Sequence, residues 1–444
     1  MDKNIEKVLL YQDKQLKELE KDRKNNLQDT ISSTEKLLDE LGISYSNTQT
    51  CNIANTNKQV LLVPKWDDLV LEASKEIDDN SSIYSLFTED ELKQNSLAIK
   101  QINRDFRQIY KLDKGDWALC ILAGLIGGLT DIFLVGIPHN DPKMAKDGSI
   151  SDLVKKTFNK IYPPERINEL ENMAKVPFDS QDNRNLEIPV EGLSAYMHRL
   201  YELGHDPIVG YIVGVIDIMK GTTTTIDKFG KFVSQDSIGF EKRIETNLVK
   251  AIIKEFNHLQ SDVNTPMGLP APLMGLCNLL QIGKIGEDEQ TVAEIMQGMY
   301  YEGFDFRHFV SQSVSTIIIE TIVRFVYSIR KIKAGNEIKD SIPISLNRDK
   351  NPKLATMLFV SHSLAIAVNA GKVYLTKDPC AINEAEWLAF AKYSFKQAKW
   401  VLIDKPARLN KQFDEWAYNE LIEVIRYDDE LFDEFSKDYI VVFD

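Results

Sequence analysis

The sequence predicts a mainly α-helical protein, built as a large helical bundle with amphipathic helices at the N-terminus and an acidic segment at the C-terminus. Apolar residues recur at helical spacing near the N-terminus, as Ile5, Leu9 and Leu16 do. Asp206 followed by Pro207 is typical of a helix start, because Asp caps the first turn and Pro fits within it. Three later segments are apolar over lengths that strands rarely reach: 208–219, 314–328 and 355–370.

Length, composition and net charge indicate which kinds of protein and which binding partners are compatible with this chain. With 444 residues, 43% of them apolar, the chain is long enough for two or three domains and a large core. The net charge of −14 argues against nucleic acid as a partner, because phosphate binding needs clustered Lys and Arg. No secretory signal is visible, and the cysteines lack C-x-x-C spacing, so we expect a reducing, cytoplasmic location. The four cysteines are Cys51, Cys120, Cys277 and Cys380.

Residues 1–113 are expected to form two regions outside the apolar core. Residues 1–45 are interpreted as two amphipathic helices, separated near residues 25–33 and suited to self-association into homo-oligomers through their apolar stripes. Residues 46–113 combine a linker rich in Ser, Asn and Thr with a small helical region. The linker is expected over 43–60, an extended piece at 59–64, and helices at 67–77 and 89–110.

Residues 114–402 form the predicted apolar helical core, and the most apolar stretch within it is 117–138. That stretch approaches the length of a membrane span but carries four glycines and Asp131. It is either a membrane-spanning helix or a buried helix of a soluble or peripheral bundle, and the second interpretation is favoured. The expected location is therefore cytoplasmic, with a membrane surface as a candidate partner and peripheral or integral attachment to the inner membrane as the alternatives. Glycines 124, 127 and 128 are expected to permit close helix packing.

Further helices are predicted along the core and the C-terminal tail. His205 is expected at a junction before the helix that begins at Asp206 and Pro207. The run Thr222–Thr225 is interpreted as a helix-to-loop transition. Residues 403–444 should form an acidic segment of helices with an extended end at 439–443. The remaining helices are expected at 195–203, 243–260, 289–302, 306–331, 354–370 and 383–402, with loops at 138–148 and 177–189.

Histidines and carboxylates within the core have the residue types and spacing of a metal site. His258 and Asp262 lie four residues apart on a predicted helix, so both side chains point to the same side. His198 and His205 are seven residues apart and can share a face if the chain does not bend between them. Asp131 is a further candidate, because an isolated carboxylate in an apolar run demands a partner. A shared divalent ion would account for all of these polar groups together.

The ligand candidates also have an interpretation that needs no metal. His258 and Asp262 can hydrogen-bond within their helix, and His198 and His205 can each be satisfied by a neighbour of its own. Asp131 can be neutralised by an arginine. The candidates for that arginine are Arg199, Arg307 and Arg324.

Four other polar residues of the core have open roles. Arg199 can anchor a phosphate or carboxylate of a substrate, or satisfy a neighbouring acid. Asp206 can act as a base toward water, but a helix N-cap is the commoner role of such a residue. His308 and His362 lie on apolar helices and are expected to be core histidines.

The third motif carries a resemblance to a known family. It reads His258-x-x-x-Asp262-x-x-Thr265-x-x-Gly268, and it follows a Gly-rich segment with an Asp and an element that begins with His-Arg. The YdjM-type bacterial membrane-bound metal-dependent hydrolases have a similar order: an Asp-containing Gly-rich segment, an HR-x-x-THS element and an H-x-x-x-D-x-x-T-x-x-G element. The resemblance covers roughly residues 117–275, about a third of the chain, and only the third element fits closely.

The resemblance implies a helical, divalent-metal hydrolase related in style to zinc-dependent phospholipases. The chain departs from the family pattern in the second element, where His205 follows His198 by seven residues instead of five and Asp206 replaces a serine. The family's tight D-x-D-H grouping is absent, and His139 and Asp141 are the candidates to replace it. The metal-site residues that the resemblance implies are His198, His205, His258, Asp262 and Asp131.

A metal-dependent hydrolase is therefore the leading hypothesis from the sequence. The four ligands would be His198, His205, His258 and Asp262, and zinc is favoured over magnesium or manganese. Asp131 or Asp206 would orient or deprotonate the attacking water, and Arg199 would contact the substrate. A small phosphoester or a lipid-derived molecule is the expected substrate. The rival hypothesis is a non-enzymatic helical protein, either a membrane-interacting effector or an assembly scaffold.

Overall fold

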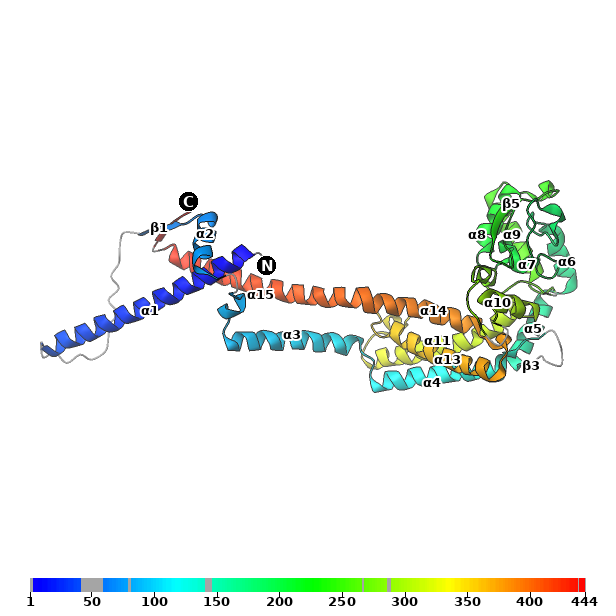
Figure 1. The fold of residues 1–444 in the computed structure, drawn as a ribbon. Helices are drawn as coiled ribbons and strands as arrows, with labels where there is room; N and C mark the ends of the chain where they lie inside the picture. The colour runs from blue at the N-terminus through cyan, green and yellow to red at the C-terminus, as the bar shows by residue number, and fades with distance from the viewer. Residues whose placement is uncertain are drawn as a thin grey trace. The chain divides into compact units, whose positions relative to one another are not determined.

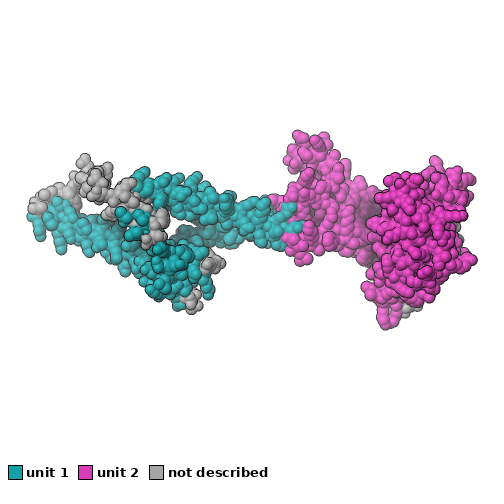
Figure 2. Space-filling model, turned by 90° about the horizontal axis from the view of Figure 1, so that it is seen from above, with its two compact units in different colours: residues 1–108, 404–444 teal, residues 109–403 magenta. Residues whose placement is uncertain are grey.

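The computed structural model describes residues 3–40, 59–78, 81–139, 146–265, 267–285, 289–437 and 439–443. Its elements are mainly helices, which confirms the predicted fold class. The chain divides into two compact units, one made of residues 1–108 and 404–444 and the other of residues 109–403 (Figure 2). The predicted apolar core, 114–402, lies within the second unit.

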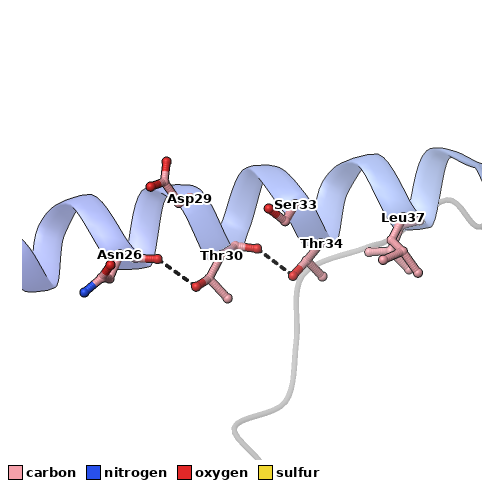
Figure 3. Close-up of a pocket in the computed structure, with 7 residues that line it drawn as sticks. Asn26, Asp29, Thr30, Ser33, Thr34 and Leu37 are labelled. Carbon is pink, nitrogen blue, oxygen red and sulfur yellow. Dashed lines mark hydrogen bonds between the residues drawn. The ribbon is translucent and has the colours of Figure 1, made fainter.

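The N-terminal unit begins with one long helix, α1 (Lys3–Glu40), where two helices were predicted (Figure 1). Within the stretch expected to interrupt the helix, the hydroxyls of Thr30 and Thr34 donate hydrogen bonds to the carbonyls of Asn26 and Thr30, each at 2.7 Å (Figure 3). These polar residues keep helical geometry because their side chains bond back to the preceding turn. Residues 41–58, and with them most of the predicted linker, lie outside the described residues.

Near its start, helix α1 packs against α2 (Trp66–Glu76). Val8 and Leu10 are buried, and Lys14 pairs with Glu76 at 2.7 Å. Farther along α1, most leucines are exposed, namely Leu16, Leu19, Leu27 and Leu37. Self-association through this stripe stays a prediction.

The other elements of this unit follow the sequence closely. Strand β1 (Gln59–Val63) pairs in parallel with β6 (Tyr439–Phe443), which confirms both predicted extended pieces. Helix α3 (Glu89–Tyr110) matches the predicted helix 89–110, and α15 (Lys405–Phe435) occupies most of the acidic tail. A 3₁₀ turn, η1 (Ile83–Leu86), precedes α3.

The second unit contains a bundle of packed helices. Its members are α4 (Lys114–Thr130), α11 (Phe306–Lys333), α13 (Leu354–Thr376) and α14 (Glu384–Lys399). Helix α4 begins at a capping box between Asp113 and Asp116 and continues as a π-helical turn, η2 (Asp131–Val135). Buried apolar side chains such as Leu119 and Ile319 pack between the helices. By length and composition, three helical runs of the described chain could cross a membrane: α11, α13 and the joined run Glu89–Val135 that contains α4.

Glycines bring α4 close to its neighbours, as the sequence predicted. A Cβ atom at Gly124 would lie 2.5 Å from the carbonyl oxygen of Ser361, and one at Gly128 would lie 2.7 Å from Cβ of Val368. Both of those neighbours belong to α13. Gly127 meets α11 in the same way. Any side chain at these positions would force the helices apart.

Residues 136–305 leave the bundle after α4 and return to it at α11. Their helices are α5 (Ser149–Ile161), α6 (Pro164–Met173), α7 (His198–Tyr201), α8 (Gly210–Lys220), α9 (Leu248–Asp262) and α10 (Val292–Tyr301). Two antiparallel hairpins join β2 (Gly136–Ile137) to β3 (Lys146–Asp147) and β4 (Thr222–Ile226) to β5 (Phe232–Asp236). The short elements of the unit are η3 (Asn183–Asn185), η4 (Leu203–His205), η5 (Glu241–Arg243), η6 (Met274–Leu279), α12 (Ile338–Ser341), η7 (Pro379–Ala381) and η8 (Trp400–Asp404).

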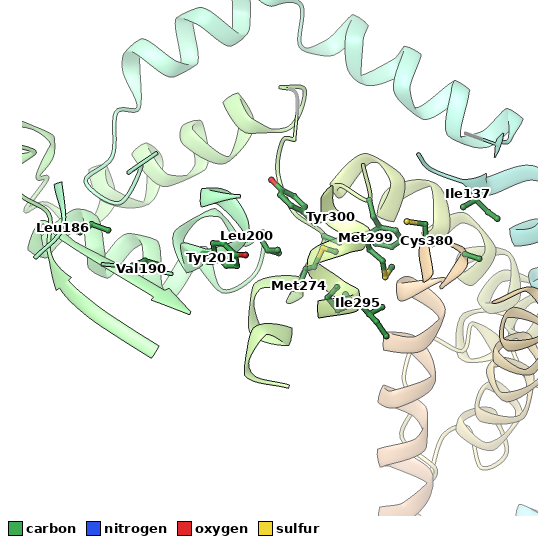
Figure 4. Packing of buried hydrophobic residues seen from close by; sticks show 14 residues of the cluster. Ile137, Leu186, Val190, Leu200, Tyr201, Met274, Ile295, Met299, Tyr300 and Cys380 are labelled. Atoms are coloured by element: carbon green, nitrogen blue, oxygen red, sulfur yellow. The ribbon is translucent and has the colours of Figure 1, made fainter. Parts of the chain in front are cut away.

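The main hydrophobic core of this region forms where α7 and α10 meet the turns η6 and η7 (Figure 4). Leu200 and Tyr201 come from α7, Met274 from η6, and Met299 and Tyr300 from α10. This core fixes α7, and therefore the chain on both sides of it, against the rest of the region.

Two sequence predictions for this region were wrong. Thr222–Thr225 lies in strand β4 and not in a helix-to-loop transition, because Gly221 ends α8 in a left-handed conformation (φ 77°) and β-branched Thr favours an extended chain. The helix predicted at 195–203 is only α7, which ends where Glu202 takes an extended conformation (ψ 110°). His198 and His205 therefore do not share a helix face.

A candidate metal centre

Three of the predicted ligands and one unpredicted carboxylate surround His205. Two groups have ligand atoms within 4.8 Å of one another: Asp179, His198 and His205 form one, and His205, His258 and Asp262 form the other. All are buried except Asp179, which is half-exposed. The structure thus brings together the four ligands proposed from the sequence, although α7, η4 and α9 supply them separately.

Helix α9 presents His258 and Asp262 side by side, as their spacing predicted. Asn247 caps the helix by accepting a hydrogen bond from the backbone N–H of Lys250 at 3.1 Å. At the other end the backbone N–H of Leu269 donates to the carbonyl of Asp262 at 2.9 Å. Gly268 permits this return, because a Cβ there would collide with the same carbonyl.

Two ring nitrogens of this cluster have no hydrogen-bond partner although they are buried. They are Nε2 of His198 and Nε2 of His258. Nδ1 of His198 contacts the carbonyl of Ala195 at 3.0 Å, which turns Nε2 toward Asp179 Oδ1 at 3.4 Å. Nε2 of His258 lies 3.6 Å from Asp262 Oδ2. Tetrahedral ligands about 2.0–2.1 Å from zinc are separated by about 3.3 Å, so both gaps have the size that a shared ion produces.

His205 lies between two carboxylates at the centre of the cluster. Its Nδ1 contacts Asp262 Oδ2 at 2.8 Å, and its Nε2 contacts Glu202 Oε2 at 3.1 Å. The backbone N–H of Ser180 donates to the other oxygen of Glu202 at 3.0 Å, so Glu202 is itself held in place. Burial lowers the pKa of His205 to about 4 against the opposing pull of Asp262, which favours the neutral imidazole that binds metals.

The charge of Asp262 is stabilised on both sides. Burial opposes its ionisation, but the Arg199 and His258 charges and the hydrogen bond from His205 outweigh burial and hold its pKa well below the usual range. Nε of Arg199 lies 3.0 Å from Asp262 Oδ1, and Nη1 of Arg199 donates to the carbonyl of Met267 at 3.1 Å. Arg199 therefore satisfies a neighbouring acid, the second of its two predicted roles.

The carboxyl of Asp179 is also kept ionised. Burial again opposes ionisation, but the neighbouring imidazoles of His198, His258 and His205 lower its pKa. Since Asp179 is the half-exposed member of the cluster, it marks the side on which solvent reaches the candidate site.

Asp131, which was expected at the metal site, belongs to neither group of ligands. Its Oδ2 accepts hydrogen bonds from Lys372 and Asn369, each at 3.0 Å, and its Oδ1 accepts one from Asn383 at 2.8 Å. The partner is thus a lysine of α13 and not one of the three arginines considered from the sequence. Both oxygens are occupied inside the helical bundle.

Both carboxylate oxygens of Asp206 accept hydrogen bonds from backbone N–H groups, so neither is free to act at the candidate metal site. Its Oδ1 accepts from the backbone N–H groups of Ile208 and Val209, each at 2.9 Å, and its Oδ2 accepts from Leu273 at 2.6 Å. Burial raises the pKa of Asp206 and these hydrogen bonds oppose the rise. Asp206 therefore caps the turn 207–209 and not α8 itself, which starts at Gly210 after Val209, so the helix start predicted at Asp206 and Pro207 was too early.

The other histidines lie apart from this cluster. His139 contacts Asp378 at 2.7 Å and Glu302 at 3.4 Å, and Asp141 lies outside the described residues. His308 and His362 are buried within helices, which confirms that they are core histidines.

Three carboxylates near the ligands were missed by sequence reasoning: Asp179, Glu202 and Glu255. A signal for two of them is visible, since a glutamate precedes both His205 and His258 by three residues. Both oxygens of Glu255 are buried without a hydrogen-bond partner, and burial raises the pKa of this carboxyl well above its usual value. Asp179 lies in a loop and has no comparable signal.

The cluster offers three imidazoles and two ionised carboxylates, a set that suits a divalent cation. No protein-family model, no curated protein and no solved structure matches this chain.

Proposed function

We propose that the protein is a metal-dependent hydrolase whose cation is held by His198, His205, His258, Asp262 and Asp179. One observation carries this proposal: Nε2 of His198 and Nε2 of His258 are buried, lack hydrogen-bond partners and face carboxylates at 3.4 Å and 3.6 Å. Leaving buried polar atoms unpaired costs about 1–3 kcal/mol each, which a bound cation would recover.

The donor set favours zinc, with manganese and magnesium as alternatives, because imidazole nitrogen outnumbers carboxylate oxygen. A bound cation would polarise a phosphoryl or acyl oxygen and lower the pKa of coordinated water. The chain's own residues prepare that site. Glu202 fixes the ring of His205, as carboxylates commonly do for metal-bound histidines, and Arg199 fixes the carboxylate of Asp262.

A phosphoester or lipid-derived substrate is proposed from the family resemblance and from the apolar helices in the same unit. The guanidinium of Arg199 gives no further support for a phosphoester, because it is engaged with Asp262 and Met267 inside the protein. Asp179 is the ligand nearest to solvent, so a substrate would approach from its side.

Metal analysis of the purified protein tests the proposal. Wild-type protein purified from zinc- or manganese-supplemented medium should retain a divalent ion, and the His258→Ala/Asp262→Ala variant should lose it. The matched control is His139→Ala, which removes a histidine that lies outside the cluster. Hydrolysis of a generic phosphodiester should depend on the retained metal. Wild-type protein without bound metal, or equal metal content in both variants, would contradict the proposal.

The rival function, a non-enzymatic effector that interacts with membranes, is the second candidate. It is favoured by the exposed apolar side chains of α4, among them Ile121, Leu125 and Leu129. The two candidates differ in metal dependence. Only the hydrolase needs the ion, so vesicle binding without any metal-dependent hydrolysis would select the effector.

A further inference from the structure

Helix α4 exposes an unbroken apolar surface. The exposed positions from residue 117 to 134 are all apolar: Trp117, Ala118, Ile121, Leu122, Leu125, Leu129, Phe133 and Leu134. Phe133 is 71% exposed and Leu122 is 55% exposed. A helix on the surface of a water-soluble protein normally turns its polar residues outward, so this distribution is the reverse of the usual one.

The polar residues of the same helices face inward instead. Asp131, His362, Asn369 and Lys372 are all buried, although they belong to helices whose outer positions are apolar. Asp131 is satisfied by Asn369 and Lys372, and Nδ1 of His362 contacts Glu386 at 3.1 Å. In a lipid bilayer, polar side chains must find partners within the bundle, as these do.

In the sequence, polar and charged residues within the apolar segments argued against membrane spans. Their inward placement in the structure removes that objection. The apolar runs of α11 and α13 contain charged or polar residues, but His362 and Asn369 point into the bundle. On α11, Arg324 pairs with Glu320 at 2.5 Å and donates to the carbonyl of Ile344 at 3.3 Å. None of these groups therefore stands alone on an outer surface.

The helices also have the required length. Helix α4 and the turn η2 cover residues 114–135, which is about 33 Å at 1.5 Å per residue, and a bilayer core is about 30 Å thick. Helices α11 and α13 have 28 and 23 residues. Trp117 lies near the start of α4 and Tyr374 near the end of α13, and both are exposed, as aromatic residues at membrane interfaces commonly are.

Contacts within the bundle define which helix ends lie together. Asp116, near the start of α4, pairs with Arg330, near the end of α11, so these two helices run in opposite directions. Asp131, at the end of α4, pairs with Lys372, near the end of α13, at 3.0 Å, so these two run in the same direction. Residues 136–305 therefore leave and re-enter the bundle at one end. The link 334–353 lies at the other end, where Lys353 pairs with Asp116 at 3.0 Å.

Positive charge gathers at that second end. The basic residues from 330 to 353 are Arg330, Lys331, Lys333, Lys339, Arg348, Lys350 and Lys353. At the first end, the short connection 377–383 has only Lys377, and the 20 residues that follow η2, 136–155, add three lysines: Lys143, Lys146 and Lys155. Loops rich in Lys and Arg stay on the cytoplasmic side of membrane proteins.

From these observations we infer that α4, α11 and α13 cross a lipid bilayer and that α14 returns the chain across it, because Asn383, the N-cap of α14, donates to Asp131, and Trp400, which follows α14, contacts Arg348 of the link. The link 334–353 then lies on the cytoplasmic side, and residues 136–305, which carry the candidate metal centre, lie on the opposite side. An even number of crossings also keeps the paired strands β1 and β6 on one side of the bilayer. This arrangement replaces the cytoplasmic location expected from the cysteines for residues 136–305. It does not depend on a bound metal, so it can fail or hold independently of the proposed hydrolase.

Site-specific labelling of full-length protein in intact bacterial spheroplasts tests this orientation. In a background without the native cysteines, Ile282→Cys places a thiol at a position that is 66% exposed within 136–305, and Ile344→Cys places one that is 82% exposed in the basic link. A membrane-impermeant maleimide should label Ile282→Cys before lysis and Ile344→Cys only after lysis. The reverse pattern would overturn the orientation, and soluble protein labelled at both positions only after lysis would overturn the membrane span itself.

Introducing charge on α4 tests what surrounds its exposed face: a lipid bilayer, water or a second copy of the chain. Leu122→Lys/Leu125→Lys should sharply reduce the fraction of protein that resists extraction from membranes by carbonate, because lysine is costly in the hydrocarbon core. Ile344→Lys in the basic link is the control and should leave that fraction unchanged. If the Leu122/Leu125 variant instead gains solubility or only loses a dimer, the bilayer proposal fails.

Discussion

Nε2 of His258 lies 3.6 Å from Oδ2 of Asp262, one helical turn along α9, and has no hydrogen-bond partner. The gap is too long for a hydrogen bond between two groups that could readily form one. It matches the separation of two atoms bound to one ion. The same pattern occurs between His198 and Asp179 at 3.4 Å, and the two pairs belong to two groups of ligand atoms that both include His205.

Asp262→Asn should abolish metal retention and destabilise the protein. The substitution leaves the charge of Arg199 buried without its partner, which typically costs about 3–5 kcal/mol. Thermal and chemical denaturation of the metal-free protein measure the loss. The Arg199→Met/Asp262→Asn double variant should regain part of the stability but none of the metal binding. Recovery of metal binding in the double variant would contradict the assignment of Asp262 as a ligand.

The relation of Asp262 to His258 was predictable because both residues lie on one helix, where spacing fixes direction. The contribution of Asp179 was not, because its place depends on how the loop that carries it packs against His198 of α7 and against Glu202. For Asp131, the apolar surroundings in the sequence indicated that it needs a partner. They could not identify that partner, because Lys372 is 241 residues away in the sequence. Local periodicity gave the bounds of helices such as α3 and α11 well. It failed within residues 1–45 and at 195–203, and also at Thr222–Thr225, where strand pairing decides the structure.

Glu202→Gln should weaken metal binding about 10- to 100-fold while the protein stays folded. Glu202 does not face the proposed ion but holds the ring of His205 at 3.1 Å, and removing such partners commonly lowers metal affinity by that factor. Competition with a chromophoric chelator gives the affinity, and circular dichroism checks the fold. Glu302→Gln, near His139, is the matched control and should bind metal as the wild type does. Equal affinities in the two variants would exclude a positioning role for Glu202.

His139 should contribute stability that depends on pH. Burial lowers its pKa, but hydrogen bonds and charge interactions with Asp378 and Glu302 outweigh burial and raise the pKa above 6.5. Because the folded protein holds this proton more tightly than the unfolded chain does, the contribution is fully present below about pH 6.5. It is lost as the pH rises through the folded-state pKa. The difference in unfolding free energy between wild type and His139→Gln should therefore shrink from pH 6 to pH 9. A difference that grows with pH would reverse the assigned sign.

A side chain at Gly214 of α8 should force the buried carboxylate of Glu255, on α9, to shift, because that carboxylate fills the space beside Gly214. A Cβ at Gly214 would lie 2.6 Å from Oε1 and 2.8 Å from Cδ of Glu255. We expect Gly214→Ala to destabilise the protein by about 1–3 kcal/mol, the usual range for overpacking in a closed interface. Glu255→Ala alone should lower the free energy of unfolding by less than the removal of a typical buried carboxylate does, because neither oxygen of Glu255 has a hydrogen-bond partner to lose. The Gly214→Ala/Glu255→Ala double variant should be more stable than Gly214→Ala alone, which urea denaturation of all four proteins can measure. Strict additivity of the two substitutions would show that the Glu255 side chain does not occupy this space in solution.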